Sequence, residues 1–161
     1  YIFRSIKGLG ADRIANTIAA IKYYGKNIIV LDFGTATTFD IIKNSKYIGG
    51  VISPGIQVSN YALSESAAKL KTIKIIKNYN IAGRNTEKAM QNGFYWGYVS
   101  LINGIISKII KQNNFKPKLI LTGGLAKIFC KEIKLKAVID QNLTLNGLYH
   151  IGILNVKSKK F

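Results

Sequence analysis

Short apolar runs and amphipathic stretches alternate along the 161-residue chain and predict the order of its helices and strands. Between Ala11 and Tyr24, isoleucines recur at i, i+4 and i+7, which predicts an amphipathic helix that Gly25 ends. Three β-branched runs follow, as is typical of buried strands. We expect strands at 27–33, 37–43 and 46–52, then a helix at 56–68 after the break at Ser53-Pro54-Gly55.

The remainder of the sequence predicts an alternation of helices and strands. We expect a long helix over 86–112, a strand over 117–121, a helix over 125–132, a strand over 137–140 and a terminal helix over 143–154. Residues 1–9 and 69–85 show no clear period, apart from one short strand expected near 73–76, and the basic tail 156–161 is expected to fray. This order favours a single domain over residues 1–161, with a mixed sheet covered by helices.

Composition limits the classes of protein that the chain can represent. Apolar residues make up 48% of the sequence and only two prolines occur, which excludes a disordered or fibrous chain. Cys130 is the only cysteine, so a disulfide framework is excluded and a cytoplasmic location is expected. No apolar run approaches the roughly 18 residues of a membrane span, so no membrane partner is expected.

The charge balance is strongly basic, with 24 Lys and Arg residues against 7 acidic residues and a formal net charge of +17. Bidentate recognition of phosphates is made by arginine rather than lysine, but only three of these cations are arginine. The lysines are spread along the whole sequence. Lys, Ile and Asn are over-used together, as an AT-rich coding sequence would produce. We therefore attribute the charge to compositional drift, expect no nucleic-acid partner, and treat the scarce carboxylates as candidates for chemistry.

A polar turn after the first predicted strand is a candidate phosphate site. Asp32 lies at the end of the strand, and Gly34, Thr35 and Thr37 follow it. The glycine lets backbone N–H groups approach a polyphosphate, the hydroxyls add hydrogen bonds, and the carboxylate can hold a cation beside the phosphates. The alternative is a plain hairpin with a satisfied aspartate at its turn.

The start of the first predicted helix, Gly10-Ala11-Asp12-Arg13, is a second candidate site. Acidic residues favour helix N-termini, so Asp12 is either a simple capping residue or a functional one. In the functional interpretation, Asp12 is a general base that takes a proton from a hydroxyl attacking phosphorus. Arg13 would then position an anionic group of the substrate.

Two further motifs lie beside predicted helices. The glycines of Thr122-Gly123-Gly124, between a strand and a helix, admit a flat ligand such as an adenine ring. Gly83-Arg84-Asn85-Thr86 opens the long helix, where Asn85 or Thr86 either caps the helix or faces a ligand. His150 and the aromatic patch around Trp96 are interpreted as structural, the patch as packing or a subunit interface.

Together these motifs resemble the type III pantothenate kinases, members of the actin/hexokinase/Hsp70-like ATPase superfamily. The matching stretches run in family order: GADRIAN (10–16), DFGTATTFD (32–40), YIGGVISPGI (47–56), GRNTEKAMQNGFYWGY (83–98), LTGGLA (121–126) and DQNLTLNGL (140–148). The resemblance implies an α/β fold, a ribonuclease H-like mixed sheet flanked by helices, as the second half of an actin-like ATPase. It also implies ATP-dependent phosphorylation of pantothenate to 4′-phosphopantothenate, the first step of coenzyme A biosynthesis.

The resemblance also implies roles for individual residues. Asp12 corresponds to the proton acceptor for the pantothenate hydroxyl, and Asp32 to the ligand of an activating potassium or ammonium ion. The substrate-binding positions are Phe3, Gly10, Ala11, Asp12, Arg13 and Thr86. The expected ATP-binding positions are Thr35 and Thr122-Gly123-Gly124, with Gly34 and Thr37 of the polar turn. Magnesium would accompany ATP, and the family forms homodimers with the substrate near the subunit interface.

Two departures from the family pattern stand out. The family's first Asp-x-Gly-Asn-Thr phosphate loop does not occur in the 161 residues, and Ala67-Ala68-Lys69-Leu70-Lys71 stands where the family tends to have Thr-Ala-Lys-Leu-Pro. Either the complete protein is longer or the chain comes from a decayed or split gene, and we expect the chain alone to be inactive. The alternatives are an inactive relic or regulatory binding module on the same fold, and a sugar or acetate kinase of the same superfamily.

Overall fold

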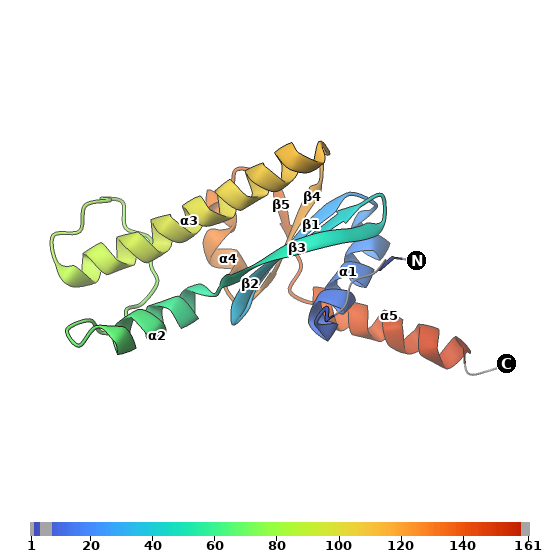
Figure 1. The fold of residues 1–161 in the computed structure, drawn as a ribbon, viewed down its shortest axis with the longest axis horizontal. Helices are drawn as coiled ribbons and strands as arrows, with labels where there is room; N and C mark the ends of the chain where they lie inside the picture. The colour runs from blue at the N-terminus through green and yellow to red at the C-terminus, as the bar shows by residue number, and fades with distance from the viewer. Residues whose placement is uncertain (1, 4–7, 159–161) are drawn as a thin grey trace.

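The computed structural model describes residues 2–3 and 8–158, with side chains described as far as Leu154. Within these residues a five-stranded mixed sheet forms the centre of the fold (Figure 1). Its strands are β1 (Ile28–Phe33), β2 (Ala36–Lys43), β3 (Lys46–Pro54), β4 (Lys118–Gly123) and β5 (Ala137–Ile139). The helices are α1 (Ala11–Tyr24), α2 (Ile56–Ser66), α3 (Thr86–Asn113), α4 (Ala126–Phe129) and α5 (Leu143–Ser158), with a 3-10 turn η1 (Cys130–Glu132) after α4.

The strand order is β3-β2-β1-β4-β5. Short turns make β1, β2 and β3 an antiparallel meander, whereas β1, β4 and β5 run parallel. Parallel neighbours need a long crossover, and α3 lies in the connection that leads to β4. The carboxyl ends of β1 and β4 therefore meet at one edge, where Asp32 pairs with Thr122 and Phe33 with Gly123. The expected fold class, a mixed sheet flanked by helices, is confirmed.

Both faces of the sheet are covered, which explains why β1 is apolar almost throughout. Ile29, Leu31 and Phe33 point into a core shared with α3 and α4, whereas Ile28 and Val30 point to the opposite face, against α1 and α5. This alternation is the two-residue period of a strand. The sheet therefore fixes where α1 and the carboxyl end of β1 lie relative to each other.

Helix α2 and the N-terminal part of α3 extend beyond the sheet, on the side away from α1 (Figure 1). The segment that joins them, residues 67–85, contains no strand, so the short strand expected near 73–76 is wrong. The side-chain amide of Asn60, 13 positions away in sequence, donates to the carbonyl of Ile73 at 2.7 Å and accepts from its N–H at 3.2 Å. A side chain thus satisfies the backbone groups that a neighbouring strand would otherwise pair.

The other expected elements are found, α1 with the expected bounds and the rest with shifted ends. The helix expected over 125–132 divides into α4 and η1, and the terminal helix continues to Ser158, into the tail that was expected to fray. Residues 159–161 of that tail, like residues 1 and 4–7, lie outside the described residues. No helix in the described part of the chain is both long and apolar enough to cross a membrane.

Candidate active site

Asp32 lies half-buried at the carboxyl end of β1, beside the Thr122-Gly123 end of β4. Gly123 adopts φ = 86°, which favours glycine. A Cβ atom at this position would lie 2.6 Å from Asp32 Oδ1 and 2.6 Å from the Phe33 nitrogen. The glycine therefore leaves the room that the Asp32 carboxylate occupies.

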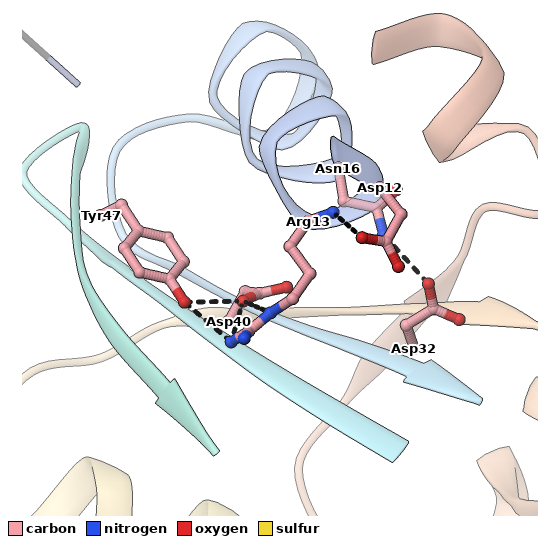
Figure 2. Close-up of polar contacts among 6 residues, drawn as sticks. All are labelled: Asp12, Arg13, Asn16, Asp32, Asp40 and Tyr47. Carbon is pink, nitrogen blue, oxygen red and sulfur yellow. Dashed lines mark hydrogen bonds and ion pairs between the residues drawn. The ribbon is translucent and has the colours of Figure 1, made fainter. Parts of the chain in front are cut away.

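Asn16 of α1, which is fully buried, fixes the orientation of this carboxylate. Its Nδ2 donates to Asp32 Oδ2 at 3.0 Å (Figure 2), and its Oδ1 accepts from Thr144 Oγ1 of α5 at 2.7 Å. The hydroxyl of Thr144 thereby determines which way the Asn16 amide faces. Within the described residues Asp32 Oδ1 makes no hydrogen bond, so one carboxylate oxygen remains available to a ligand.

Asp12 stands in the first turn of α1 and is exposed. Its Oδ1 accepts the backbone N–H of Arg13 at 2.8 Å. A Cβ at Gly10 would come within 2.5 Å of the same oxygen, so the glycine allows the carboxylate to lie against the helix terminus. Negatively charged side chains are favourable near a helix N-terminus. In Figure 2, Asp12 and Asp32 lie on one side of the helix end, and Arg13 extends to the other.

The charge of Asp12 acts on the Asp32 carboxylate. Burial raises the pKa of Asp32, the Asn16 hydrogen bond lowers it, and the negative charge of Asp12 raises it further. A cation beside Asp32 would relieve both unfavourable effects. No group of three or more His, Cys, Asp and Glu side chains in the described part of the chain is placed to hold a metal.

Arg13 extends from the same turn to a buried pair on β2 and β3. Its Nε donates to Asp40 Oδ1 at 2.8 Å, and its Nη2 lies 2.7 Å from that oxygen and 2.8 Å from the Tyr47 hydroxyl (Figure 2). Phe3 forms a β-bridge with Tyr47, and their ring centroids lie 5.9 Å apart. The structure thus brings Phe3, Asp12 and Arg13 into one region, and their role in substrate binding stays a prediction.

The polar turn between β1 and β2 contains an exposed Thr35, whose carbonyl accepts from the N–H of Gly55 at 3.0 Å. A side chain at Gly55 would collide with the Gly34 carbonyl oxygen, so the start of α2 packs directly on this turn. Thr37 differs from the expectation that it faces a nucleotide. It is fully buried and its hydroxyl is hydrogen-bonded to that of Tyr98, which ties β2 to α3.

The remaining predicted residues lie on two other elements. Gly124 follows β4 and is exposed, with open space where a Cβ would stand. Asn85 caps α3 by accepting the Lys88 N–H at 2.9 Å, which leaves the exposed Thr86 hydroxyl without a capping role. Thr86 lines a cavity of about 360 Å³ at the end of α3 that lies away from α1, so the structure does not bring it to Asp12 within one chain (Figure 1).

Sequence reasoning missed Asn16, Asp40, Tyr47 and Thr144 as parts of this region. Asn16 and Asp40 belong to the quoted motifs GADRIAN and DFGTATTFD, so position within a motif was the available signal. Tyr47 opens a third motif, and Thr144 lies within the last one. Their partners are 7 to 128 positions away in the sequence, and only the fold reveals such pairings.

The fold is that of the actin/hexokinase-like ATPases. MreB 5 of Spiroplasma citri, bound to AMPPNP, superimposes with a TM-score of 0.59 at 14% identity, over 93% of this chain and 60% of that one. A Clostridium difficile activator of 2-hydroxyisocaproyl-CoA dehydratase, with bound ADPNP, gives a TM-score of 0.54 at 9% identity, over 93% and 69%.

A conserved Campylobacter jejuni protein assigned to the Baf family of transcriptional activators is also similar, with a TM-score of 0.68 and 26% identity over 98% of this chain and 70% of that one. The type III pantothenate kinase family model matches residues 3–108. The chain therefore belongs to the type III pantothenate kinase family.

Proposed function

We propose that this chain carries the base and the substrate-binding face of an enzyme that phosphorylates pantothenate at the expense of ATP. The observation that supports this most is the position of Asp12, exposed at the N-terminus of α1 and close enough to Asp32 to raise the pKa of that residue. A base for phosphoryl transfer must reach the attacking hydroxyl and must be ionised. Asp12 is exposed at the start of the helix, so a substrate hydroxyl can reach it.

In the proposed reaction, the oxygen of the pantothenate hydroxyl bonds to the γ-phosphorus of ATP. The Asp12 carboxylate accepts the proton of that hydroxyl. The bond between that phosphorus and the β,γ-bridging oxygen breaks, and ADP leaves with the electron pair. Arg13 binds the anionic end of pantothenate, and Phe3 covers the neighbouring surface. A monovalent cation held by Asp32, and Mg²⁺ on the nucleotide, would neutralise phosphate charge when bound.

We place the nucleotide at the edge formed by β1 and β4. The turn at Gly34-Thr35 would meet the phosphates, and Gly124 leaves open space for the adenosine. The similarity to MreB 5 and the dehydratase activator, each with an ATP analogue bound, supports nucleotide binding by this fold. The Asp-x-Gly-Asn-Thr phosphate loop of the family is not among the 161 residues. We therefore expect turnover only when a segment with that loop is supplied.

We further propose that two copies of the chain complete each other's sites. Asp12 and Thr86 are both expected to contact pantothenate. Asp12 lies in the first turn of α1, whereas Thr86 begins α3, whose N-terminal part extends away from α1 (Figure 1). A homodimer in which Thr86 of one copy approaches Asp12 of the other would bring them together. Cyclic dimers of this kind are the commonest oligomers.

The test is the formation of phosphopantothenate by the wild-type chain and the Asp12→Asn variant, each measured alone and fused to the N-terminal half of a family member. We expect product from the wild-type fusion and little from the variant. A sugar and acetate serve as competing acceptors, since kinases of this superfamily that use them share the fold. Phosphorylation of either competitor in preference to pantothenate would refute the proposal.

A regulatory role on the same fold is the second candidate. Two observations favour it: the Campylobacter jejuni protein is assigned to a family of transcriptional activators, and this chain has a net charge of +17. DNA binding that weakens steeply with salt, together with no phosphopantothenate formed by the fusion, would support this alternative.

A further inference from the structure

Asp40 is a fully buried carboxylate in the middle of β2. A buried charge is strongly unfavourable unless it is paired and hydrogen-bonded. Burial raises the pKa of Asp40, whereas Arg13 and the Tyr47 hydroxyl lower it. The fold therefore tolerates the ionised carboxylate only because Arg13 reaches it from α1.

The three side chains form a closed set of hydrogen bonds, which we call the arginine clamp (Arg13, Asp40 and Tyr47). Two nitrogens of Arg13 meet Asp40 Oδ1, at 2.8 and 2.7 Å, and Nη2 also donates to the Tyr47 hydroxyl at 2.8 Å. That hydroxyl in turn donates to Asp40 Oδ1 at 3.0 Å. Three bonds thus hold the guanidinium in one plane and one orientation.

The neighbouring strand is shaped to admit the guanidinium. Gly50 of β3 pairs with Asp40 of β2, and a Cβ at Gly50 would collide with Arg13 Nη2 and lie 2.8 Å from the Tyr47 hydroxyl. Asp40 Oδ2 is buried and has no hydrogen-bond partner among the described residues. A contact built for stability alone would be expected to satisfy both oxygens, because an unpaired buried polar atom is costly.

The clamp leaves part of Arg13 available. A guanidinium has five N–H groups, and the clamp uses Nε and Nη2. Within the described residues Nη1 makes no hydrogen bond, and the side chain retains 13% exposure. The two N–H groups of Nη1 therefore form a short, oriented donor edge, one residue along the chain from Asp12.

We propose that Asp40 and Tyr47 are positioning residues that hold Arg13 so that its free edge binds the carboxylate of the substrate. This inference rests on the proposed pantothenate kinase function. Holding the arginine in place during folding removes an entropic cost that substrate binding would otherwise bear. The gain is in binding the anionic end of the substrate, away from the phosphoryl group.

The decisive variant is Tyr47→Phe, measured in the form of the protein that phosphorylates pantothenate. Phe retains the ring that packs on Phe3 and removes the hydroxyl from the clamp. We expect the KM for pantothenate to rise about tenfold, as loss of one hydrogen bond to a charged group predicts, with kcat and the KM for ATP changed less than about twofold. In an Arg13→Lys background, Tyr47→Phe should have little further effect, because the two act through one contact.

The matched control is Tyr24→Phe. Tyr24 donates to Asp140 Oδ2 at 2.9 Å and anchors the other end of α1, so its loss removes an equivalent tyrosine–aspartate contact far from Asp12. We expect both variants to lose similar stability, but only Tyr47→Phe to change the KM for pantothenate. A merely structural role would lower both melting temperatures and leave both KM values unchanged.

The KM values of Tyr47→Phe and the activity of the wild type together test the positioning role and the proposed function. Phosphorylation of pantothenate with an unchanged KM in Tyr47→Phe would overturn the positioning role and leave the proposed function standing. Equal changes in the KM for ATP and for pantothenate would overturn it too. A wild-type protein that neither binds nor phosphorylates pantothenate would overturn both together, so the two failures are distinguishable.

Discussion

The carboxylate of Asp32 lies where its own ionisation is unfavourable. Burial raises its pKa, and the charge of Asp12 acts in the same direction, against the hydrogen bond from Asn16. An ionised Asp32 without a bound cation therefore lowers the stability of the fold. A cation at this position would recover that free energy, which is the trade of stability for function that active sites commonly show.

We expect Asp32→Asn to raise the melting temperature of the cation-free protein near pH 7 by about 2–4 °C, the shift that ~1 kcal/mol produces in a domain of this size. Asn retains an oxygen that accepts from Asn16 and removes the buried charge.

The pH dependence of this difference has a definite sign. The folded-state pKa of Asp32 is raised, so folded wild-type protein binds the proton more tightly than unfolded protein does. The stability of the wild type therefore rises relative to that of Asp32→Asn as the pH falls through the folded-state pKa. The difference in melting temperature vanishes below the unfolded-state pKa. Calorimetry across this range, without potassium or ammonium, measures it. A lower melting temperature for Asp32→Asn near pH 7 would contradict the claim that ionised Asp32 destabilises the cation-free fold.

At the scale of elements, the placement of α1 decides the geometry of the site, because this helix carries both Asp12 and Asn16. Helix α5 packs closely against it: a Cβ at Gly147 would collide with the carbonyl oxygen of Ala15. One turn earlier in α5, Thr144 donates to Asn16. The close helix approach at Gly147 and the hydrogen bond that orients Asn16 therefore depend on each other.

We expect Gly147→Ala to destabilise the protein by about 1–3 kcal/mol, the cost of overpacking a tight contact, since the added methyl group must push α5 away from α1. Gly152→Ala, in the same helix but with open space around it, should stabilise the protein by up to about 1 kcal/mol through helix propensity. Urea unfolding measures both. Equal effects of the two substitutions would show that α5 does not pack on α1 as described.

Local pattern was enough to predict most elements. The isoleucine spacing and Gly25 predict α1 with the bounds that the structure shows, because an amphipathic helix depends only on near neighbours in sequence. The strand expected near 73–76 was wrong because Asn60, 13 positions away, binds the backbone there. The role of Thr37 was unpredictable for the same reason, since its partner Tyr98 is 61 positions away.

At the scale of the whole molecule, one chain does not bring all the expected substrate-binding residues together. Asp12 lies in the first turn of α1, whereas Thr86 begins α3, whose N-terminal part extends away from α1 (Figure 1). The chain also covers 70% of the length of the similar Campylobacter jejuni protein. The proposed homodimer would bring Thr86 of one copy to Asp12 of the other.

Mixing two variants tests the proposed homodimer. Asp12→Asn and Thr86→Ala, each impaired by itself, should together form mixed dimers with one intact and one doubly impaired site. Random exchange predicts recovery of about one quarter of the wild-type activity. Activity is measured after the subunits have exchanged. An activity equal to the mean of the two separate preparations would show that Asp12 and Thr86 do not act across an interface.

Mass spectrometry of 4′-phosphopantothenate formed by the fusion protein shows whether Asp12 is the base of a pantothenate kinase. The comparison is between wild type, Asp12→Asn, and Glu65→Gln, which neutralises an exposed carboxylate on α2. We predict product from wild type and Glu65→Gln at equal rates, and a rate about 10²–10⁴ lower for Asp12→Asn, the usual contribution of a general base. Equal rates for wild type and Asp12→Asn, or no product from wild type, would contradict the claim.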